Sequence, residues 1–558
     1  MWKIIQKNIQ LFLVIALLLV ANLIASGYFY RFDLTKEKRY SLSDLTKSTV
    51  KTLDYPLIVT VFMEGDFPPN IRKFQDAVRT TLLEMKLYAG GNLEFEFVDP
   101  AQNPELMQLF VQKGYRPIPV KVRVSPTETK EQYMWPLAVM RSRDREVYVD
   151  LLRGSSIMTP QGPNVDFLKA EADLEYKLTA SIRNLQKERG GVIALLQGHG
   201  ELSVDQIPDL GREIQNSYNL YTYNLADVPN YEVSPSVDVL VILQPTRAFS
   251  ERDKYEIDQY LIRGGSVLWV MDQEQVDMDM YRKQATLTSL YDLNLDDLFM
   301  KYGLKVNYDL IQDLESESTE VFQPGESGGT FLSKKWVFFP LIFNFPEHPI
   351  NRNVDAVMLR YASSIDTFQR AGLETSVFLH TSPLSRTIQG RQFIDVNEYV
   401  QNPPPESVFN QPQKTAGVLV EGIFESLFNG RQIPLDSLAT QPPVARFGPR
   451  NNPSAPGKMV VISDGEFVQG KLYREERGFL PYDNKILLMN AIDYLAGDEA
   501  LNQIRSKEVV VRLINVEKAR SFAGWIRVIN IALPVLLVIL FGLARFGFRR
   551  WKNEKTNA

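Results

Sequence analysis

Four short apolar runs constrain the fold of this chain more than any other feature of its sequence. The runs are residues 192–196, 237–243, 267–271 and 459–462, and Asp238 is the one polar residue among them. A nearly continuous apolar run of this length is typical of a strand that is covered on both faces, as in a parallel sheet. Helical patterns lie between the runs, so the sequence predicts a doubly wound, mainly parallel α/β sheet.

An amphipathic helix and a glycine pair precede the first run. Apolar side chains recur along one face of this helix, at Phe167, Leu174, Leu178, Ile182 and Leu185. A glycine pair at 190–191 then ends the helix. We interpret residues 167–201 as the beginning of the second α/β domain, with a Gly-His-Gly-Glu turn at the end of its first strand.

Polar residues follow each apolar run, where a parallel sheet would place a binding crevice. Ligands of open α/β sheets bind outside the carboxyl ends of the strands, and these ends share one edge of the sheet. Six candidate ligand-binding residues lie there: His199, Glu201, Gln244, Thr246, Asp272 and Asp464. An imidazole and two carboxylates could in principle support acid–base chemistry at this edge.

The His199–Glu201 pair has a chemical and a structural interpretation. A metal site needs three or four donors, and the other histidines, His348 and His380, lack ligand spacing. In the structural interpretation, which we favour, both side chains cap the loop and helix that follow. We therefore expect no metal site and no catalytic residue.

Several chemistries are excluded by residues that the sequence lacks. The chain has no cysteine, so it has no disulfide, thiolate nucleophile or cysteine metal site. It has neither a Walker A motif nor a G-x-G-x-x-G fingerprint. The chain is therefore not predicted to be an ATPase, and we expect no cofactor.

Residues 31–160 form a separate pattern of strands and helices. A strand at 57–63, a helix at 71–88 and a strand at 93–98 precede further strand candidates at 120–124 and 137–140. This order predicts a thioredoxin-like α/β domain. The redox chemistry of that fold needs a cysteine pair, so the domain is expected to be a scaffold.

The second domain is expected to span residues 161–505 and to contain a large insertion. The alternation of strands and helices breaks at about 281–457, where glycine- and proline-rich loops separate short strand candidates. A linker at 506–524 is expected to follow this domain.

Long apolar runs bracket the whole chain. Residues 9–29 carry no charge, and residues 528–546 carry none before Arg545. Each run is long enough to cross a bilayer, which predicts an N-terminal anchor within 1–30 and a C-terminal helix at 525–546. A cleaved signal peptide is the alternative for the first run.

The charge distribution indicates a membrane rather than a nucleic acid as the partner of this chain. Its net charge is −5, but its ends are basic, including the tail at 547–558. An acidic body disfavours nucleic-acid binding. We expect both termini in the cytoplasm, the large domain in the periplasm and the lipid bilayer as a partner.

Several sequence blocks, in the same order, resemble the auxiliary proteins of ABC-type transport systems. The blocks are RFDLTKEKRYSLS (31–43), LEYKLTASIRNL (174–185), GHGE (198–201), VDVLVILQP (237–245), IDQYLIRGGSVLWVMD (257–272), HTSPLSR (380–386), VLVEGIFESLFNGR (418–431) and ISDGEF (462–467). The block at 418–431 resembles in particular the gliding-motility-associated GldG family of Bacteroidetes-type bacteria. Proteins of this kind are often described as substrate-binding.

The resemblance implies a non-catalytic membrane subunit that works with a permease and a separate cytoplasmic ATPase. It also implies a flavodoxin-like or glutamine-amidotransferase-like second domain, without the nucleophilic cysteine of active amidotransferases. The body would bind an unknown periplasmic ligand or protein. Two alternatives stay open: a cell-envelope hydrolase or metalloenzyme that uses the strand-end crevice, and a purely structural scaffold.

Overall fold

The computed structural model describes residues 41–497, with gaps, and several helical residues between 532 and 545. The gaps are residues 114, 116, 124–128, 144, 160–161, 187–189, 228–232, 278–284, 326–327, 435–454 and 469–481. The chain divides into two units, Met1–Lys507 and Glu508–Ala558. The expected N-terminal anchor, the linker, the tail and most of the C-terminal helix lie outside the described residues. Within the described part of the chain, no helix is both long and apolar enough to span a membrane.

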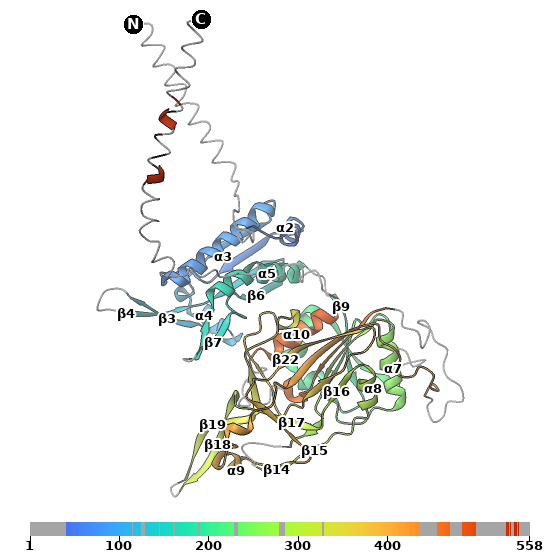
Figure 1. Cartoon of the computed structure of the whole chain (residues 1–558). Helices are drawn as coiled ribbons and strands as arrows, with labels where there is room; N and C mark the ends of the chain where they lie inside the picture. The colour runs from blue at the N-terminus through green and yellow to red at the C-terminus, as the bar shows by residue number, and fades with distance from the viewer. Residues whose placement is uncertain are drawn as a thin grey trace, which may run out of the picture. The chain divides into compact units, whose positions relative to one another are not determined.

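The first part of the larger unit is a four-stranded sheet with the order β2-β1-β5-β6 (Figure 1). β1 pairs parallel with β2 and antiparallel with β5, which pairs antiparallel with β6. The bounds of these strands are β1 (Leu57–Val61), β2 (Leu93–Phe97), β5 (Leu137–Ser142) and β6 (Arg145–Asp150). Two hairpins accompany the sheet: β3 (Ile118–Arg123) with β4 (Thr129–Met134), and β7 (Ser156–Thr159) with β8 (Gly162–Val165).

Helices cover both faces of this sheet because its strands bury alternate residues on opposite sides. Ala138 and Met140 of β5 join a core built with α2 (Asp44–Lys51), α3 (Pro69–Tyr88) and α5 (Phe167–Gln186). Leu137 and Val139 of the same strand join Phe110 of α4 (Pro104–Gln112) on the other face. The helix at 167–186, which the sequence assigned to the second domain, therefore packs in the first core.

A seven-stranded sheet forms the second part, with the order β10-β9-β11-β12-β26-β25-β22. The strands from β10 to β26 run parallel, while β25 is antiparallel to both of its neighbours. Their bounds are β9 (Gly190–Gln197), β10 (Tyr218–Asn224), β11 (Val239–Leu243), β12 (Ser266–Val270), β22 (Leu373–His380), β25 (Thr415–Gly422) and β26 (Gly457–Ile462). Since β22 and β25 lie within 281–457, part of the expected insertion completes the main sheet.

Helices on both sides of the second sheet explain its uninterrupted apolar runs. Val239 and Val241 of β11 face a core with α6 (Pro208–Ser217) and α10 (Asn484–Leu495). Leu240 and Ile242 of the same strand face a core with α7 (Glu251–Ile262) and α8 (Asp296–Lys301). The structure thus confirms a mixed α/β fold, with a parallel strand core between two helical layers.

Most of the described strands between 274 and 401, apart from β22, form small sheets, and several of these pack around an aromatic core that includes Trp336, Phe338 and Tyr361. The longest element of this region is the hairpin of β18 (Ser316–Gly325) and β19 (Gly328–Ile342), to which β20 (Val357–Met358) adds. The other elements are β13 (Glu274–Gln275), β14 (Ala285–Leu287), β15 (Ser289–Leu290), β16 (Leu304–Val306), β17 (Asp309–Asp313), β21 (Ile365–Thr367), β23 (Ser385–Gln389), β24 (Phe393–Asp395) and α9 (Val396–Gln401).

Candidate functional site

Hydrogen bonds connect the turn after β9 to the loop between β11 and α7. The backbone N–H groups of Thr246 and Arg247 both donate to the carbonyl of His199, each at 2.9 Å. The Thr246 hydroxyl donates to the carbonyl of Gly200 at 3.4 Å. Gly200 has a φ of +79°, and a Cβ at this position would collide with the Thr246 hydroxyl. Only glycine therefore fits this close approach of two loops without strain.

His199 lies between two carboxylates in a buried position. Its Nδ1 is 3.0 Å from Glu201 Oε1, and its Nε2 is 3.1 Å from Asp253 Oδ2. Burial alone would lower the pKa of His199, but the hydrogen bonds to Asp253 and Glu201 raise it to about 9. The ring is therefore an imidazolium at neutral pH and donates from both nitrogens. A ring in this state is neither a general base nor a metal ligand.

Asp253 serves the start of helix α7 as well as His199. The Ser250 hydroxyl and the Ser250 backbone N–H donate to Asp253 Oδ2 at 2.6 and 2.8 Å, and the Asp253 N–H donates back to the hydroxyl. Burial by itself would raise the pKa of Asp253, but the hydrogen bonds from His199 and Ser250 hold it below its ordinary value. This capping arrangement keeps the carboxylate ionised opposite the imidazolium.

Asp272 and Asp464 form the centre of a second cluster, at the ends of β12 and β26. Asp272 accepts from Gly465 N at 2.5 Å and from Gln244 Nε2 at 3.0 Å. Asp464 accepts from the backbone N–H groups of Arg360 at 2.6 Å and of Phe467 at 2.9 Å. Both carboxyl groups therefore hold loops together at the edge of the sheet.

The second cluster is electrostatically unfavourable for two ionised carboxylates. Burial, and then the charge of Glu466, raise the pKa of Asp272 to about 7. Burial and the neighbouring Asp272 raise the pKa of Asp464 well above its ordinary value. Glu466 is itself paired with Arg360, whose Nη1 lies 3.0 Å from Glu466 Oε2. At neutral pH the cluster therefore keeps a proton, because two buried carboxylates in close proximity do not both ionise.

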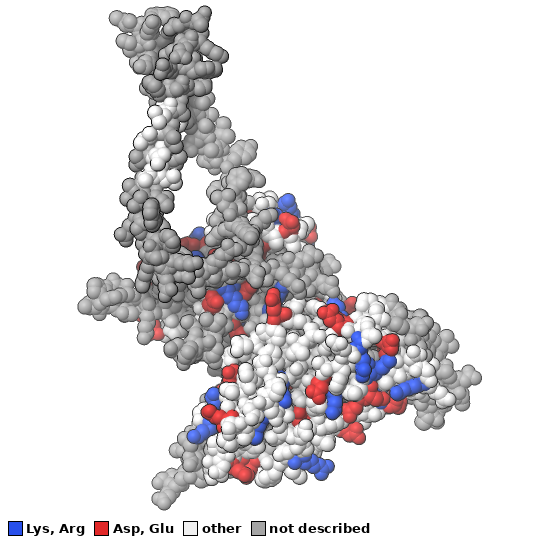
Figure 2. Space-filling view, viewed as in Figure 1, with Lys and Arg blue, Asp and Glu red and all other residues white. Residues whose placement is uncertain are grey.

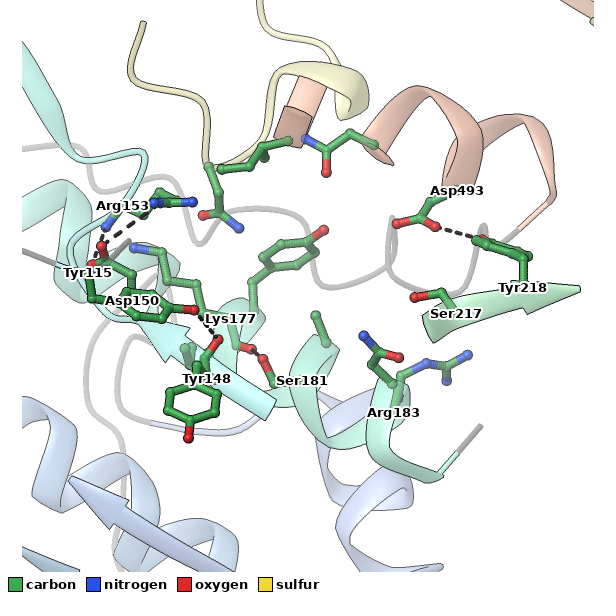
Figure 3. A pocket seen from close by; sticks show the side chains of 17 residues that line it. Tyr115, Tyr148, Asp150, Arg153, Lys177, Ser181, Arg183, Ser217, Tyr218 and Asp493 are labelled. Carbon is green, nitrogen blue, oxygen red and sulfur yellow. Dashed lines mark hydrogen bonds and ion pairs between the residues drawn. The ribbon is translucent and has the colours of Figure 1, made fainter. Parts of the chain in front are cut away.

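The six residues expected to share one crevice thus lie in two groups. His199, Glu201 and Thr246 surround the Gly198–Gly200 turn, whereas Gln244, Asp272 and Asp464 surround the loop after β26. None of these six residues lines the cavity of about 280 Å³ that Figure 3 shows. Among the described residues, no group of three His, Asp or Glu side chains is placed to hold a metal ion.

One further pattern in the sequence is settled by the fold. Residues 325–329 spell G-x-S-x-G, the pattern of a nucleophile elbow. Gly325 ends β18 and pairs with Gly328, the first residue of the antiparallel β19. A nucleophile elbow instead joins a strand to a helix, so the flanking elements do not match that motif.

Comparison with known proteins assigns the family. A family model described as "ABC-type uncharacterized transport system" matches residues 191–491, more than half of the chain. The chain belongs to this family of ABC-transporter auxiliary proteins. The match begins in β9 and ends in α10, so it includes both polar clusters of the auxiliary protein.

The remaining comparisons add less. A model described as a domain of unknown function, DUF7088, matches residues 36–141 of the auxiliary protein, over most of the first sheet. No curated protein matches the chain. A solved structure titled "mmIFT52 N-terminal domain" covers 55% of this chain and 98% of its own, with 11% identity and a TM-score of 0.32. That score is too low to carry an argument about fold or function.

Several residues that shape the two clusters were not found from the sequence. Asp253 was not identified as the partner of His199, which lies 54 residues away. Phe249 stacks on the imidazole, and Arg360 binds Asp464 across 104 residues. No spacing rule connects such distant positions, so these contacts of the auxiliary protein are visible only in three dimensions.

Proposed function

We propose that this auxiliary protein is a non-catalytic, membrane-anchored subunit of an ABC-type transport complex. Its body lies on the periplasmic side, binds a ligand or protein, and docks through its apolar ends to a permease that works with a separate cytoplasmic ATPase. Its first domain is a thioredoxin-like scaffold, and its second is flavodoxin-like. The family match over residues 191–491 is the observation that carries the proposal.

The chemistry of the strand ends supports an accessory role over an enzymatic one. An enzyme of this fold needs a base, a nucleophile or a metal at the carboxyl edge of its sheet. Here the imidazole of His199 is protonated between two carboxylates, and Asp272 and Asp464 accept hydrogen bonds from the loops around them. These groups stabilise the edge of the sheet, and their bonds leave them poorly suited to act on a substrate.

The ends of the chain support membrane anchoring. Residues 9–29 are an uncharged apolar run, and the described helical residues of the C-terminal unit include five exposed apolar side chains: Leu533, Leu536, Ile539, Phe541 and Leu543. Apolar helical residues of this kind are stable where lipid or another membrane helix covers them. The body differs, because Figure 2 shows acidic and basic side chains interspersed over the face in view.

Co-purification tests the accessory role. The tagged full-length chain is solubilised from native membranes in mild detergent, and its partners are identified by mass spectrometry. We expect a polytopic permease and an ATPase in amounts comparable to the bait. An unrelated tagged membrane protein from the same cells is the control. If the chain purifies without both partners, the proposal is wrong.

The cellular placement and the link to gliding have tests of their own. Protease added to intact spheroplasts should digest the body, and digestion only after lysis would place the body in the cytoplasm instead. The association with gliding motility rests on the resemblance of residues 418–431. A deletion strain should lose surface movement and regain it with the intact gene, and normal movement of the deletion strain would contradict the association.

A further inference from the structure

A cavity of about 280 Å³, lined mostly by polar and charged residue types, lies between the first sheet with its helix α5 and the elements α6, β10 and α10 of the second sheet. Figure 3 shows Tyr148, Asp150, Arg153 and Lys177 at one end and Ser217, Tyr218 and Asp493 at the other. Direct contacts hold the two sides together nearby: Gly154 N donates to Asp355 Oδ2 at 2.9 Å, and the Arg352 guanidinium lies 4.5 Å from the Tyr176 ring centre. The cavity therefore lies at a junction that these direct contacts hold together.

The wall from the first sheet is cationic. Arg153, Lys177 and Arg183 line it, against the single carboxylate of Asp150. Lys177 is 4% exposed, and its ammonium donates to the Leu151 carbonyl at 2.8 Å. An ammonium group has three N–H donors, so this one carbonyl does not saturate it. Burial of a lysine at a cavity wall is costly unless an anion or further acceptors compensate the charge.

The opposite wall offers hydroxyl and amide groups rather than cations. Ser217, Asn353 and Asn490 line it, together with Tyr218 and Asp493. The Tyr218 hydroxyl donates to Asp493 Oδ1 at 2.6 Å, which occupies one oxygen of that carboxylate. The Asn490 amide nitrogen donates to the carbonyls of Ile350 and Arg352 at 2.9 and 2.7 Å, which fixes the orientation of that side chain.

The size and shape of the cavity limit what it can hold. Small-molecule sites usually enclose about 300–1,000 Å³, so a volume of about 280 Å³ suits one compact solute. Aromatic rings of Tyr115 and Tyr148, stacked at 5.8 Å, add a flat surface at the cationic end. The lining contains three cationic side chains and two carboxylates. Asp173 and Asp355 also act on Lys177, and Asp355 and Asp483 on Arg153, so the unsaturated ammonium of Lys177, rather than the net charge, favours an anionic ligand.

We propose that this cavity binds a small hydroxylated organic anion, about the size of one sugar acid or sugar phosphate, with its anionic group at Lys177 and its hydroxyl groups toward Ser217 and Asn353. The ligand touches both walls and so stabilises the junction between the two sheets. The inference rests on the proposed accessory role, because it names the class of ligand that the subunit would recognise. Its test does not require a permease or an ATPase.

Proton linkage follows from the position of Lys177. Burial lowers the pKa of Lys177 to about 8, helped by the charge of Lys169 and opposed by the carboxylates of Asp173 on the same helix, Asp150 of β6 and Asp355 of the facing part of the junction. A bound anion favours the protonated ammonium, so binding and protonation strengthen each other. The affinity for an anion should therefore fall as the pH rises above 8, which a neutral ligand would not show.

Calorimetric titration of the full-length chain in detergent tests the proposal, with D-glucuronate, D-gluconate and D-glucose 6-phosphate as probes and D-glucose as the neutral control. We expect saturable binding of at least one anion, and much weaker binding of D-glucose. No saturable binding of any of the three anions would overturn the proposal, as would equal affinity for D-glucose. Co-purification can succeed or fail independently, so the two tests separate the ligand site from the accessory role.

Variants of helix α5 locate the binding in the cavity. Lys177→Met removes the charge but keeps most of the length of the side chain, and should weaken anion binding about tenfold or more, because it removes a charge-assisted hydrogen bond. Lys169→Met removes the same charge from an exposed position on α5 and should leave the affinity within about twofold. Ala180→Leu fills the cavity without removing a hydrogen-bonding group and should also weaken binding. If Lys177→Met and Ala180→Leu both bind like the natural chain, the anion does not occupy this cavity.

Discussion

The imidazole of His199 lies flat against the ring of Phe249, with ring centroids 3.9 Å apart and an interplanar angle of 11°. Phe249 in turn meets Trp269 of β12 edge-on at 5.5 Å. Because His199 is protonated, this contact is a cation–π interaction between a turn and the aromatic core. The Gly-His-Gly-Glu turn resembles an active-site motif in the sequence. In the fold, its charged histidine holds together the loops that follow β9 and β11.

The charge of His199 makes the stability of the protein depend on pH. Its pKa is about 9 in the fold and 6.5 without it, so its stabilisation is fully present below pH 6.5 and is lost as the pH rises through 9. The shift corresponds to a loss on the order of 3 kcal/mol. His199→Gln should be less stable than the natural chain at pH 6.5, with a difference that narrows by pH 9.5. Thermal unfolding across this range is the measurement, and a constant difference in Tm would contradict the assignment.

Gly200→Ala should destabilise the turn through two separate effects. The left-handed backbone costs about 1 kcal/mol for a residue other than glycine, and the collision with the Thr246 hydroxyl adds to this cost. Gly430→Ala is a matched control, since Gly430 has a similar φ of +76° but nothing within 4 Å of an added Cβ. We expect a clearly larger fall in Tm for Gly200→Ala, part of which Thr246→Ala should restore. Equal effects at the two glycines would show that the collision is relieved at no cost.

Neutralising Asp272 should remove a pH dependence of the same sign, at a lower pH than that of His199. Its pKa rises from 3.8 to about 7 on folding, so the fold binds a proton that the unfolded chain has lost, and stability declines as the pH rises from 4 to 7. Asp272→Asn keeps an acceptor for Gly465 N and is neutral throughout. The Tm of this variant should fall less between pH 4 and 7 than that of the natural chain. Parallel curves would mean that Asp272 titrates normally.

Asp258 should be the strongest single tie between helix α7 and residues 423–431. Its carboxylate accepts from the Ser426 hydroxyl at 2.6 Å, from Leu427 N at 2.7 Å and from the Tyr302 hydroxyl at 2.5 Å. Asp258→Ala leaves several buried donors without an acceptor, at about 1–3 kcal/mol each. Tyr302→Phe removes only one of these donors and should cost about 1 kcal/mol.

Amide hydrogen exchange separates the local effect of these variants from global unfolding. In Asp258→Ala the amides of residues 426–428 should exchange faster than in the natural chain at a temperature where both are folded. The Tyr302→Phe variant should leave the protection of these amides nearly unchanged. Unchanged exchange in Asp258→Ala would show that the segment is held by its apolar contacts alone.

The second sheet could be read from the sequence because its strands are buried on both faces. The four apolar runs correspond to β9, β11, β12 and β26, and the intervening helical patterns to α6 and α7. The antiparallel strands β22 and β25 were visible only as short candidates within a supposed insertion. The sequence of a short strand does not show which sheet the strand joins. Strands pair through backbone hydrogen bonds, and almost every residue can form these.

The position of α5 and the contacts of the candidate site were beyond the sequence for a related reason. The periodicity of α5 shows which face is apolar, but not which sheet covers it. One trace of the cavity was present in the sequence: Lys177 lies between Leu174 and Leu178 on the buried side of α5, where a charged residue is unusual. The H-x-E spacing identified Glu201 as a partner of His199, but neither Asp253 nor Phe249.

Neighbouring residues of helix α5 contribute to two different parts of the protein, the first core and the cavity. Leu174, Leu178 and Ile182 fill the first core, while Lys177 and Ser181 border the cavity. The helix cannot rotate to adjust the cavity without pulling apolar side chains out of that core, which close packing resists. The packing of the neighbouring core therefore determines the geometry of the cavity. Substitutions in the core of the first sheet would consequently change which solutes bind in the cavity, although these residues do not contact the solute.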